Sequence, residues 1–186
     1  QEVVRQISER IAKSGHQVVI ATGKHNDRKF KTWHSVEIKE FEIKGNLADG
    51  IEGEKESYRE FLLNNDFDII TFFAAQQWAT VVALPVLDKI KSKKVFVPTG
   101  FSGFYSPAYK DYFLKMETWM QKFDMNIFSS DNYRDINFAR ENGVTKITLI
   151  PNGAAKDEFF PQSKIDIRKN LGRNKDDFLV LHVGSY

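Results

Sequence analysis

The stretch FDIITFFAAQQWATVVALPVLDKIKSKKVFVP, residues 67–98, decides the fold class. It begins with a short apolar run at 67–73 and ends with another at 94–98, and an apolar helical pattern occupies 78–91 between them. Short continuous apolar runs are typical of strands that are buried on both faces of a parallel sheet. The stretch therefore predicts a strand, a helix and a second strand, with Pro85 kinking the helix.

The same succession continues toward the C-terminus. Further strands are predicted at 125–130, 146–150 and 178–183, and helices at 54–64, from 106 onward, at 131–142 and at 163–171. On the helix that begins at Ser106, one apolar face is expected to lie in the core, namely Tyr112, Met116, Trp119 and Phe123. Strict alternation of helices and short apolar strands predicts an α/β fold, a Rossmann-like parallel sheet with helices on both faces.

The first third of the chain is less regular. A helix is predicted at 1–14 and ends at Gly15, and a short strand follows at 17–22. A second strand is predicted at 35–43, with an irregularity near 39–40. Three glycines, Gly45, Gly50 and Gly53, mark the segment after it as a loop.

The 186 residues suffice for one domain and part of a second. We expect residues 1–162 to form a Rossmann-like domain. Residues 163–186 are expected to form a linker and the first strand of a second domain, because a strand that starts at Phe178 cannot close a domain by itself. The chain starts inside a helical pattern, so an earlier beginning of the natural protein is expected.

The composition excludes several classes of protein. Hydrophobic residues at 41% and charged residues at 28% indicate a globular protein. A net charge of +2 is too balanced for a dedicated nucleic-acid binder. The absence of cysteine excludes disulfide scaffolds and thiolate nucleophiles, and the His residues lack metal-binding spacing. The longest apolar run, 78–87, is shorter than the roughly 20 residues of a membrane-spanning helix.

Small and polar residues follow the predicted strands at their carboxyl ends. Ligands bind beyond these ends in open parallel sheets. We therefore predict a substrate-binding site formed by Gln76, Gln77, Thr99, Gly100, Phe101, Ser102, Asn152 and Gly153. Neutral amides and hydroxyls donate and accept hydrogen bonds, which suits a hydroxyl-rich ligand such as a sugar.

Each of these segments also has a purely structural explanation. Asn152-Gly153 is ordinary turn chemistry, and Asp131 is placed to cap its helix. The glycine-rich 99–103 segment lacks the lysine and the spacing of a phosphate loop. Gln76 and Gln77 are harder to explain in this way, because buried amides need partners. No Ser-His-Asp set and no facing carboxylate pair is apparent, so the catalytic residues are unknown.

A basic segment with interleaved aromatic residues spans 24–33. It contains Lys24, Arg28, Lys29, Phe30, Lys31 and Trp33. A solvated loop is the simpler interpretation, and contact with an anionic membrane surface is the functional one.

Several motifs, taken in order, are similar to those of one family. They are IAKSGHQV at 11–18, FDII at 67–70, IFSS at 127–130, IPNG at 150–153 with EFFP at 158–161, and LHVG at 181–184. Together they resemble the N-terminal domain of family 4 glycosyltransferases, which have the two-domain GT-B architecture. The IPNG segment is the most diagnostic, and within it Asn152 and Gly153 match the family motif residue by residue.

The resemblance implies a retaining, hexosyltransferase-type enzyme that moves a sugar from a nucleotide sugar to a glycan or lipid-linked acceptor. This chain would be the acceptor-side half, inactive alone, with Asn152 and Gly153 facing the donor across the cleft. The setting implied is bacterial polysaccharide or glycolipid biosynthesis in the cytoplasm, peripheral to the inner face of the membrane. No metal, no further cofactor and no nucleic-acid partner are expected.

The resemblance also implies elements that these residues lack. The family's first strand and glycine-rich loop would precede Gln1, and its donor-binding basic residues and E-x7-E motif would follow Tyr186. Many members carry a histidine where this chain has Thr99-Gly100-Phe101-Ser102. A general base from that position is therefore not expected.

Other interpretations remain open from the sequence. Within the GT-B enzymes, the alternatives are a nucleotide-sugar epimerase or a glycogen-synthase-like protein. From another class, a non-catalytic flavodoxin-like or periplasmic-type module would bind a small ligand with these residues alone. The fold by itself does not decide among them.

Overall fold

The computed structural model describes residues 2–160 and 167–182 of the chain. The chain divides into two compact units, residues 1–152 and residues 153–186, and each is considered by itself. The predicted domain boundary after residue 162 lies outside the described residues and stays a prediction. The described part of the second unit contains one short helix, α6 (Ile167–Asn170).

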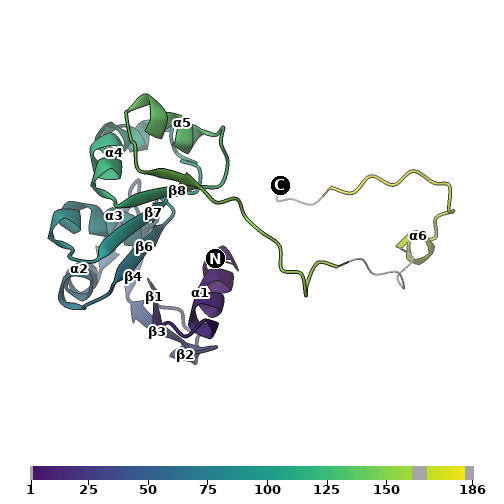
Figure 1. The fold of residues 1–186 in the computed structure, drawn as a ribbon, viewed down its shortest axis with the longest axis horizontal. Coiled ribbons are helices and arrows are strands. Elements are labelled where there is room, and N and C mark those ends of the chain that lie inside the picture. The colour runs from purple at the N-terminus through teal and green to yellow at the C-terminus, as the bar shows by residue number, and fades with distance from the viewer. Residues whose placement is uncertain (1, 161–166, 183–186) are drawn as a thin grey trace. The chain divides into compact units, whose positions relative to one another are not determined.

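A four-stranded parallel sheet organises the first unit (Figure 1). Its strands are β6 (Ile69–Phe73), β7 (Lys93–Val97), β8 (Met125–Phe128) and β9 (Ile147–Leu149), in that spatial order. All three pairings are parallel, so the four carboxyl ends lie at the same edge of the sheet. The parallel α/β fold predicted from residues 67–98 is confirmed.

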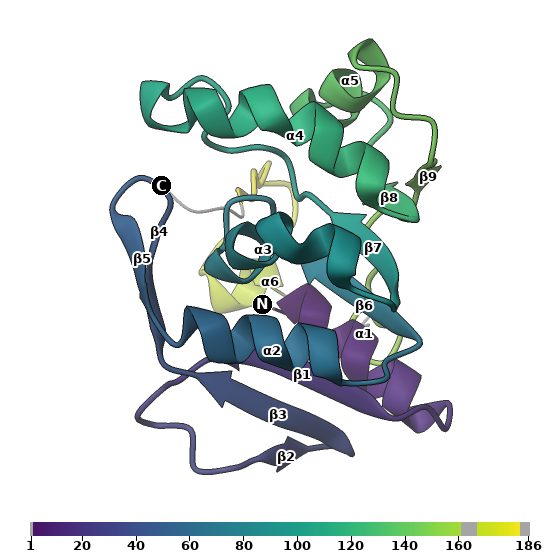
Figure 2. The same cartoon turned by 90° about the vertical axis from the view of Figure 1, so that its left-hand side faces the viewer.

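Helices connect successive strands of this sheet. Helix α2 (Lys55–Asn64) leads into β6, and the connecting helices are α3 (Trp78–Ala83), the 3-10 helices η1 (Leu84–Lys89) and η2 (Pro107–Tyr109), α4 (Lys110–Lys122) and α5 (Arg134–Glu141). Right-handed crossovers that always lead to the next strand place their helices on one face of the sheet. Figure 2 shows α2, α3 and α4 in front of the strands and α1 behind β1, so helices flank the strands of this unit on both sides, as predicted.

The N-terminal part forms a second, smaller sheet. Strand β1 (Val18–Gly23) pairs in parallel with β3 (Val36–Phe41), and β2 (Thr32–Trp33) pairs antiparallel with β3. Helix α1 (Glu2–Lys13) packs against this sheet. His34 and Ser35, between β2 and β3, have φ angles of 45° and 66°, as a type I′ hairpin turn requires.

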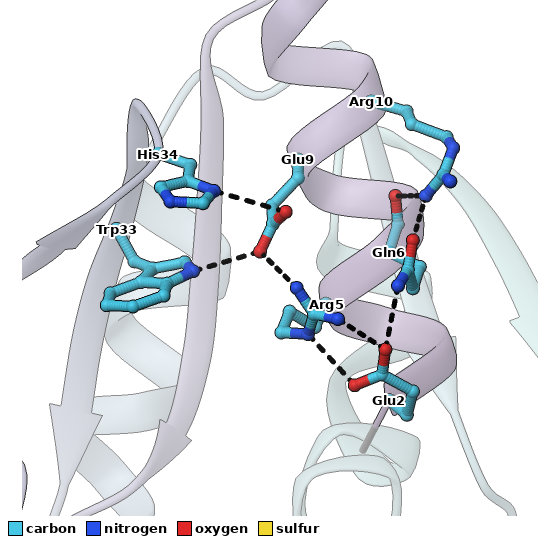
Figure 3. Close-up of polar contacts among 7 residues, drawn as sticks. All are labelled: Glu2, Arg5, Gln6, Glu9, Arg10, Trp33 and His34. Carbon is cyan, nitrogen blue, oxygen red and sulfur yellow. Dashed lines mark hydrogen bonds and ion pairs between the residues drawn. The ribbon is translucent and has the colours of Figure 1, made fainter. Parts of the chain in front are cut away.

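Glu9 on α1 holds this hairpin (Figure 3). The Trp33 indole N–H donates to one Glu9 oxygen at 2.9 Å, and His34 Nδ1 lies 3.2 Å from the other. Arg5 Nη1 bonds Glu9 at 2.9 Å as well. Partial desolvation opposes ionisation, but the bonds from Arg5, Trp33 and His34 outweigh it and lower the pKa of Glu9.

Aromatic side chains fill the core between the parallel sheet and its helices. Phe96 of β7 and Phe123 after α4 are fully buried, and their rings stack with centroids 4.7 Å apart. Tyr112 and Met116 are buried too, and Trp119 packs against the same cluster. The apolar face predicted for the helix after Ser106 is therefore a core face, as expected.

The predicted helix at 78–91 changes character at its proline. Residues 78–83 are α-helical, and residues 84–89 form a 3-10 helix with Pro85 in its first turn. Proline has no N–H to continue the α-helical pattern, which explains the change.

Two predictions are wrong. The glycine-marked segment 45–53 is an antiparallel hairpin rather than a loop, made by β4 (Ile43–Asn46) and β5 (Gly50–Gly53). Gly45 and Gly53 permit it, because a Cβ at either residue would lie 1.9 Å from a carbonyl oxygen across the hairpin. The strand predicted at 178–183 is absent from its described residues, 178–182. Phe178 and Leu181 are 91% and 85% exposed there, without a neighbouring strand to cover them.

Asp124 connects the start of β7 to the turn before β8. Its Oδ2 accepts the Lys94 backbone N–H at 2.9 Å, and its own N–H donates to the Lys94 carbonyl at 2.8 Å. The Lys94 N–H, with the Lys93 and Lys94 ammonium groups, lowers the pKa of Asp124 to about 2.

We predict that Asp124→Asn destabilises the protein by about 1 kcal/mol at pH 7, the usual net contribution of such a hydrogen bond. Because the native pKa of Asp124 is depressed, its contribution is present above about pH 4 and is lost as the pH falls toward 2. Urea unfolding at pH 7 and pH 2.5 measures the difference. Asp88→Asn, at an exposed carboxylate, is the control. An equal loss at both pH values would contradict the prediction.

Candidate functional site

Three segments meet at the carboxyl edge of the parallel sheet. They follow β6 at residues 74–77, β7 at residues 98–103 and β8 at residues 129–133. The parallel pairing brings them together although they are far apart in the sequence. Hydrogen bonds between Gln76 and both Ser102 and Gly103 join the first two of these segments.

The segment after β6 is a turn that hydrogen bonds hold in place. Ala74 has φ +63°, an uncommon value for a residue with a side chain. The backbone N–H groups of Ala74 and Ala75 extend the ladder to the Val97 and Pro98 carbonyls, at 2.8 and 3.0 Å. The hydroxyl of Thr80, which is 1% exposed, donates to the Ala74 carbonyl at 2.8 Å. The turn is therefore fixed from both sides.

Tyr112 supports the same turn from the core. Its hydroxyl donates to the Ala75 carbonyl. Burial raises the pKa of Tyr112 far above its ordinary range, so the hydroxyl stays protonated and remains a donor. The position of the following residue, Gln76, is thereby determined by buried groups.

Gln76 links the turn to the loop after β7. Its Oε1 accepts the Ser102 hydroxyl at 3.0 Å and the Gly103 N–H at 2.9 Å. Gly103 lies so close that a Cβ there would be 2.2 Å from Gln76 Nε2. The structure therefore brings Gln76 and Ser102 together, whereas Gln77 is exposed at the start of α3.

The loop after β7 is held in an uncommon conformation. Thr99, Gly100 and Phe101 have φ angles of 56°, 97° and 48°. Only glycine adopts such values without cost, and strain of this kind is concentrated at functional sites. Phe101 is 1% exposed and packs against Phe104, Phe113 and Phe138, while Thr99 and Ser102 are exposed. The loop is therefore anchored by its ring and presents its hydroxyls.

Two residues that the sequence analysis did not select contact this loop. The buried carboxylate of Asp135 accepts the Gly100 N–H at 2.8 Å. The ring of Tyr133 covers Gly100, where a Cβ would lie 2.8 Å from the ring. Asp131, expected to cap α5, does not: the helix begins after Tyr133 and has no side-chain cap. A polar residue just inside a helix that follows a strand was the only sequence signal for Asp135.

Asn152 and Gly153 lie where the two units meet in the sequence. Both are exposed, and Asn152 is the last residue of the first unit, whereas Gly153 begins the second. The described contacts do not bring Asn152 to Gln76 or to the 99–103 loop. Their predicted role facing a donor stays a prediction.

The positive charge of the basic segment 24–33 is partly neutralised by neighbouring glutamates. Lys24 pairs with Glu42 at 3.1 Å, and Arg28 pairs with Glu40. Phe30 and Trp33 are 43% and 41% exposed, with their ring centroids 5.1 Å apart. The aromatic residues are therefore available to a partner, but the positive charge is smaller than the sequence indicates.

Three further observations concern other kinds of site in the described part of the chain. A hollow of about 230 Å³, lined by residues 65–68 and 91–93, lies at the amino ends of β6 and β7, away from the predicted site. Among residues 2–160 and 167–182, no three His, Asp or Glu side chains are grouped as metal ligands. None of the described helices is long and apolar enough to cross a membrane.

We predict that Gly100→Ala destabilises the protein by about 3 kcal/mol, from a left-handed backbone and a collision with the Tyr133 ring. Gly15→Ala is the matched control, because Gly15 has φ +93° but no atom near its missing Cβ. Gly15→Ala should lower the free energy of unfolding by about 1 kcal/mol. Adding Tyr133→Ala should restore part of the Gly100→Ala loss in urea unfolding. Equal losses at Gly15 and Gly100 would rule out the collision.

Comparison with known proteins completes the description of the site. Residues 1–158 match the sequence profile of Glycosyltransferase Family 4. None of the curated proteins matches the chain. A match over this much of the chain shows that the chain belongs to glycosyltransferase family 4.

Proposed function

We propose that this chain, a glycosyltransferase of family 4, binds the sugar acceptor at the carboxyl edge of its parallel sheet. The reaction would move a sugar from a nucleotide sugar to a glycan or lipid-linked acceptor, with retention of configuration. The observation that carries the proposal is the fixed 99–103 loop, which presents the exposed Thr99 and Ser102 hydroxyls beside the Gln76 amide.

Neutral polar groups on a rigid edge suit this substrate. A sugar hydroxyl both donates and accepts hydrogen bonds, as do the Thr99 hydroxyl and the Gln76 side chain. Gln76 uses its oxygen on Ser102 and Gly103, so its Nε2 group is the part that remains to donate to a ligand. Because the loop is already ordered by buried contacts, binding would cost little conformational entropy.

The proposed mechanism depends on positioning rather than on a general base. The loop has threonine, glycine, phenylalanine and serine where many family members have histidine. The departing phosphate of the donor would take the proton of the attacking acceptor hydroxyl as the new glycosidic bond forms. Catalysis would then come from orienting the acceptor and stabilising the diphosphate leaving group.

The biological setting is proposed from family membership. We propose bacterial polysaccharide or glycolipid synthesis in the cytoplasm, without a metal or further cofactor. Exposed Phe30 and Trp33 support a peripheral contact with the inner face of the membrane, whereas the pairing of Lys24 and Arg28 with glutamates weakens it. Asn152 and Gly153 are proposed to face the donor.

A thermal-shift panel of nucleoside diphosphates and nucleotide sugars tests the donor part of the proposal. A ligand of the native state at a hundred times its Kd stabilises by roughly 2.7 kcal/mol. In a form of the protein extended at both ends, one nucleotide should raise the melting temperature above all others, and its nucleotide sugar should release the free diphosphate when acceptors are added. A shift shown by these 186 residues alone, without any transfer, would favour a binding module instead.

Substitution of the site amides should reduce transfer more than stability. We predict that Gln76→Ala, in the form of the protein extended at both ends, lowers kcat/KM for the acceptor about tenfold, since it removes an orienting hydrogen bond. Asn152→Ala should lower kcat/KM for the donor to a similar extent. Gln121→Ala, at an exposed amide on α4, is the control for both. Full transfer rates in both variants would show that the site is misplaced.

A further inference from the structure

The carboxylate of Asp135 is buried without a cation. Asp135 is 5% exposed, and no lysine, arginine or histidine pairs with it among the described residues. Burial of a carboxylate is costly unless hydrogen bonds compensate. Here the compensation comes from two backbone groups, the Gly100 N–H at 2.8 Å on Oδ2 and the Ile136 N–H at 2.9 Å on Oδ1.

These two bonds join elements that are distant in the sequence. Gly100 is the middle residue of the left-handed segment after β7, and Ile136 lies in the first turn of α5 after β8. The carboxylate therefore connects the loop that presents Thr99 and Ser102 to a helix that is anchored by the core. Since both oxygens are used and the residue is buried, Asp135 does not reach a ligand itself.

Asp135 holds the 99–101 segment in a conformation that Thr99 and Phe101 do not favour. A threonine and a phenylalanine in the left-handed region cost roughly 1–2 kcal/mol each. Such strain persists only where the surroundings over-determine it. The surroundings here are Asp135 on the Gly100 N–H, the Tyr133 ring over Gly100, and the burial of Phe101. Within the loop the Phe104 N–H donates to the Phe101 carbonyl at 3.1 Å, and Asp135 provides the directed bond that joins the segment to another element.

We propose that Asp135 is a positioning residue for the sugar acceptor: its carboxylate fixes the 99–101 segment so that the Thr99 and Ser102 hydroxyls are preorganised for binding. The inference rests on the proposed function and adds a residue to it. A positioning role for Asp135 makes a demand that a purely structural role does not make. Loss of the carboxylate must impair use of the acceptor more than use of the nucleotide sugar.

The test uses Asp135→Asn, in which one of the two N–H groups loses its hydrogen-bond acceptor while the side-chain volume is kept. Glu141→Gln is the matched control, since this carboxylate is exposed and lies at the opposite end of the same helix. KM and kcat are measured separately for acceptor and donor in the form of the protein extended at both ends. Asp135→Asn should raise the acceptor KM about tenfold and leave the donor KM within about twofold. Equal changes in both, or none in either, would overturn the proposal.

Amide hydrogen exchange provides a readout that does not depend on activity. In the unmodified protein, the Gly100 amide should exchange more slowly than those of Thr99 and Phe101, for which the described residues offer no hydrogen-bond acceptor. In Asp135→Asn, exchange across 99–103 should accelerate while exchange in β7 stays unchanged, and the Glu141→Gln control should leave both unchanged. Unchanged exchange would reject the anchoring role whether or not transfer occurs.

The two failures can be told apart. If the unmodified protein, in the form extended at both ends, transfers no sugar, the proposed function is wrong, and with it the acceptor role of Asp135. If transfer occurs but Asp135→Asn affects donor and acceptor alike, only the positioning role is wrong. Should the asparagine variant fold poorly, the exchange rate of the Gly100 amide in the unmodified protein still decides whether the bond exists in solution.

Discussion

Parallel pairing of β6, β7 and β8 brings three segments to one edge of the sheet, and every feature of the candidate site depends on that alignment. A shift of β7 against β6 would separate Gln76 from Ser102, and a shift of β8 would separate Asp135 from Gly100. The aromatic core supports this register, because the ring of Phe123 packs against both Phe72 of β6 and Phe96 of β7, and all three side chains are buried. Burial of these rings thus determines the geometry of polar groups that lie outside the core.

The site combines a strained backbone with contacts that prevent its relaxation. Left-handed residues follow both β6 and β7, at Ala74 and at 99–101. Each is held by a buried group, Thr80 and Tyr112 for the first and Asp135 and Phe101 for the second. A flexible loop would have to be ordered when a ligand binds, whereas this one is ordered in advance. The arrangement fits a transferase whose proposed chemistry consists mainly of holding two substrates in place.

The sequence was sufficient to predict the parallel sheet, its connecting helices and the segments at its carboxyl edge. Short apolar runs and the Pro85 position are local signals, so they could be interpreted without tertiary information. Asp135 could not be found in this way, because its partner Gly100 lies 35 residues earlier and is brought near only by the pairing of β7 with β8. Threonine and phenylalanine likewise give no local indication of left-handed φ values. The hairpin at 43–53 was missed because glycines usually mark the end of a strand. In this hairpin they instead allow two strands to approach each other closely.

The central claim is that the sugar acceptor binds at the carboxyl edge of β6 and β7, against the 99–103 loop. Hydrogen exchange of the protein, compared with and without the acceptor that supports transfer, tests it most directly. We expect protection of the amides in 74–77 and 99–103, with no change in the basic segment 24–33. Protection confined to 24–33, or to the hollow at the amino ends of the strands, would contradict the claim.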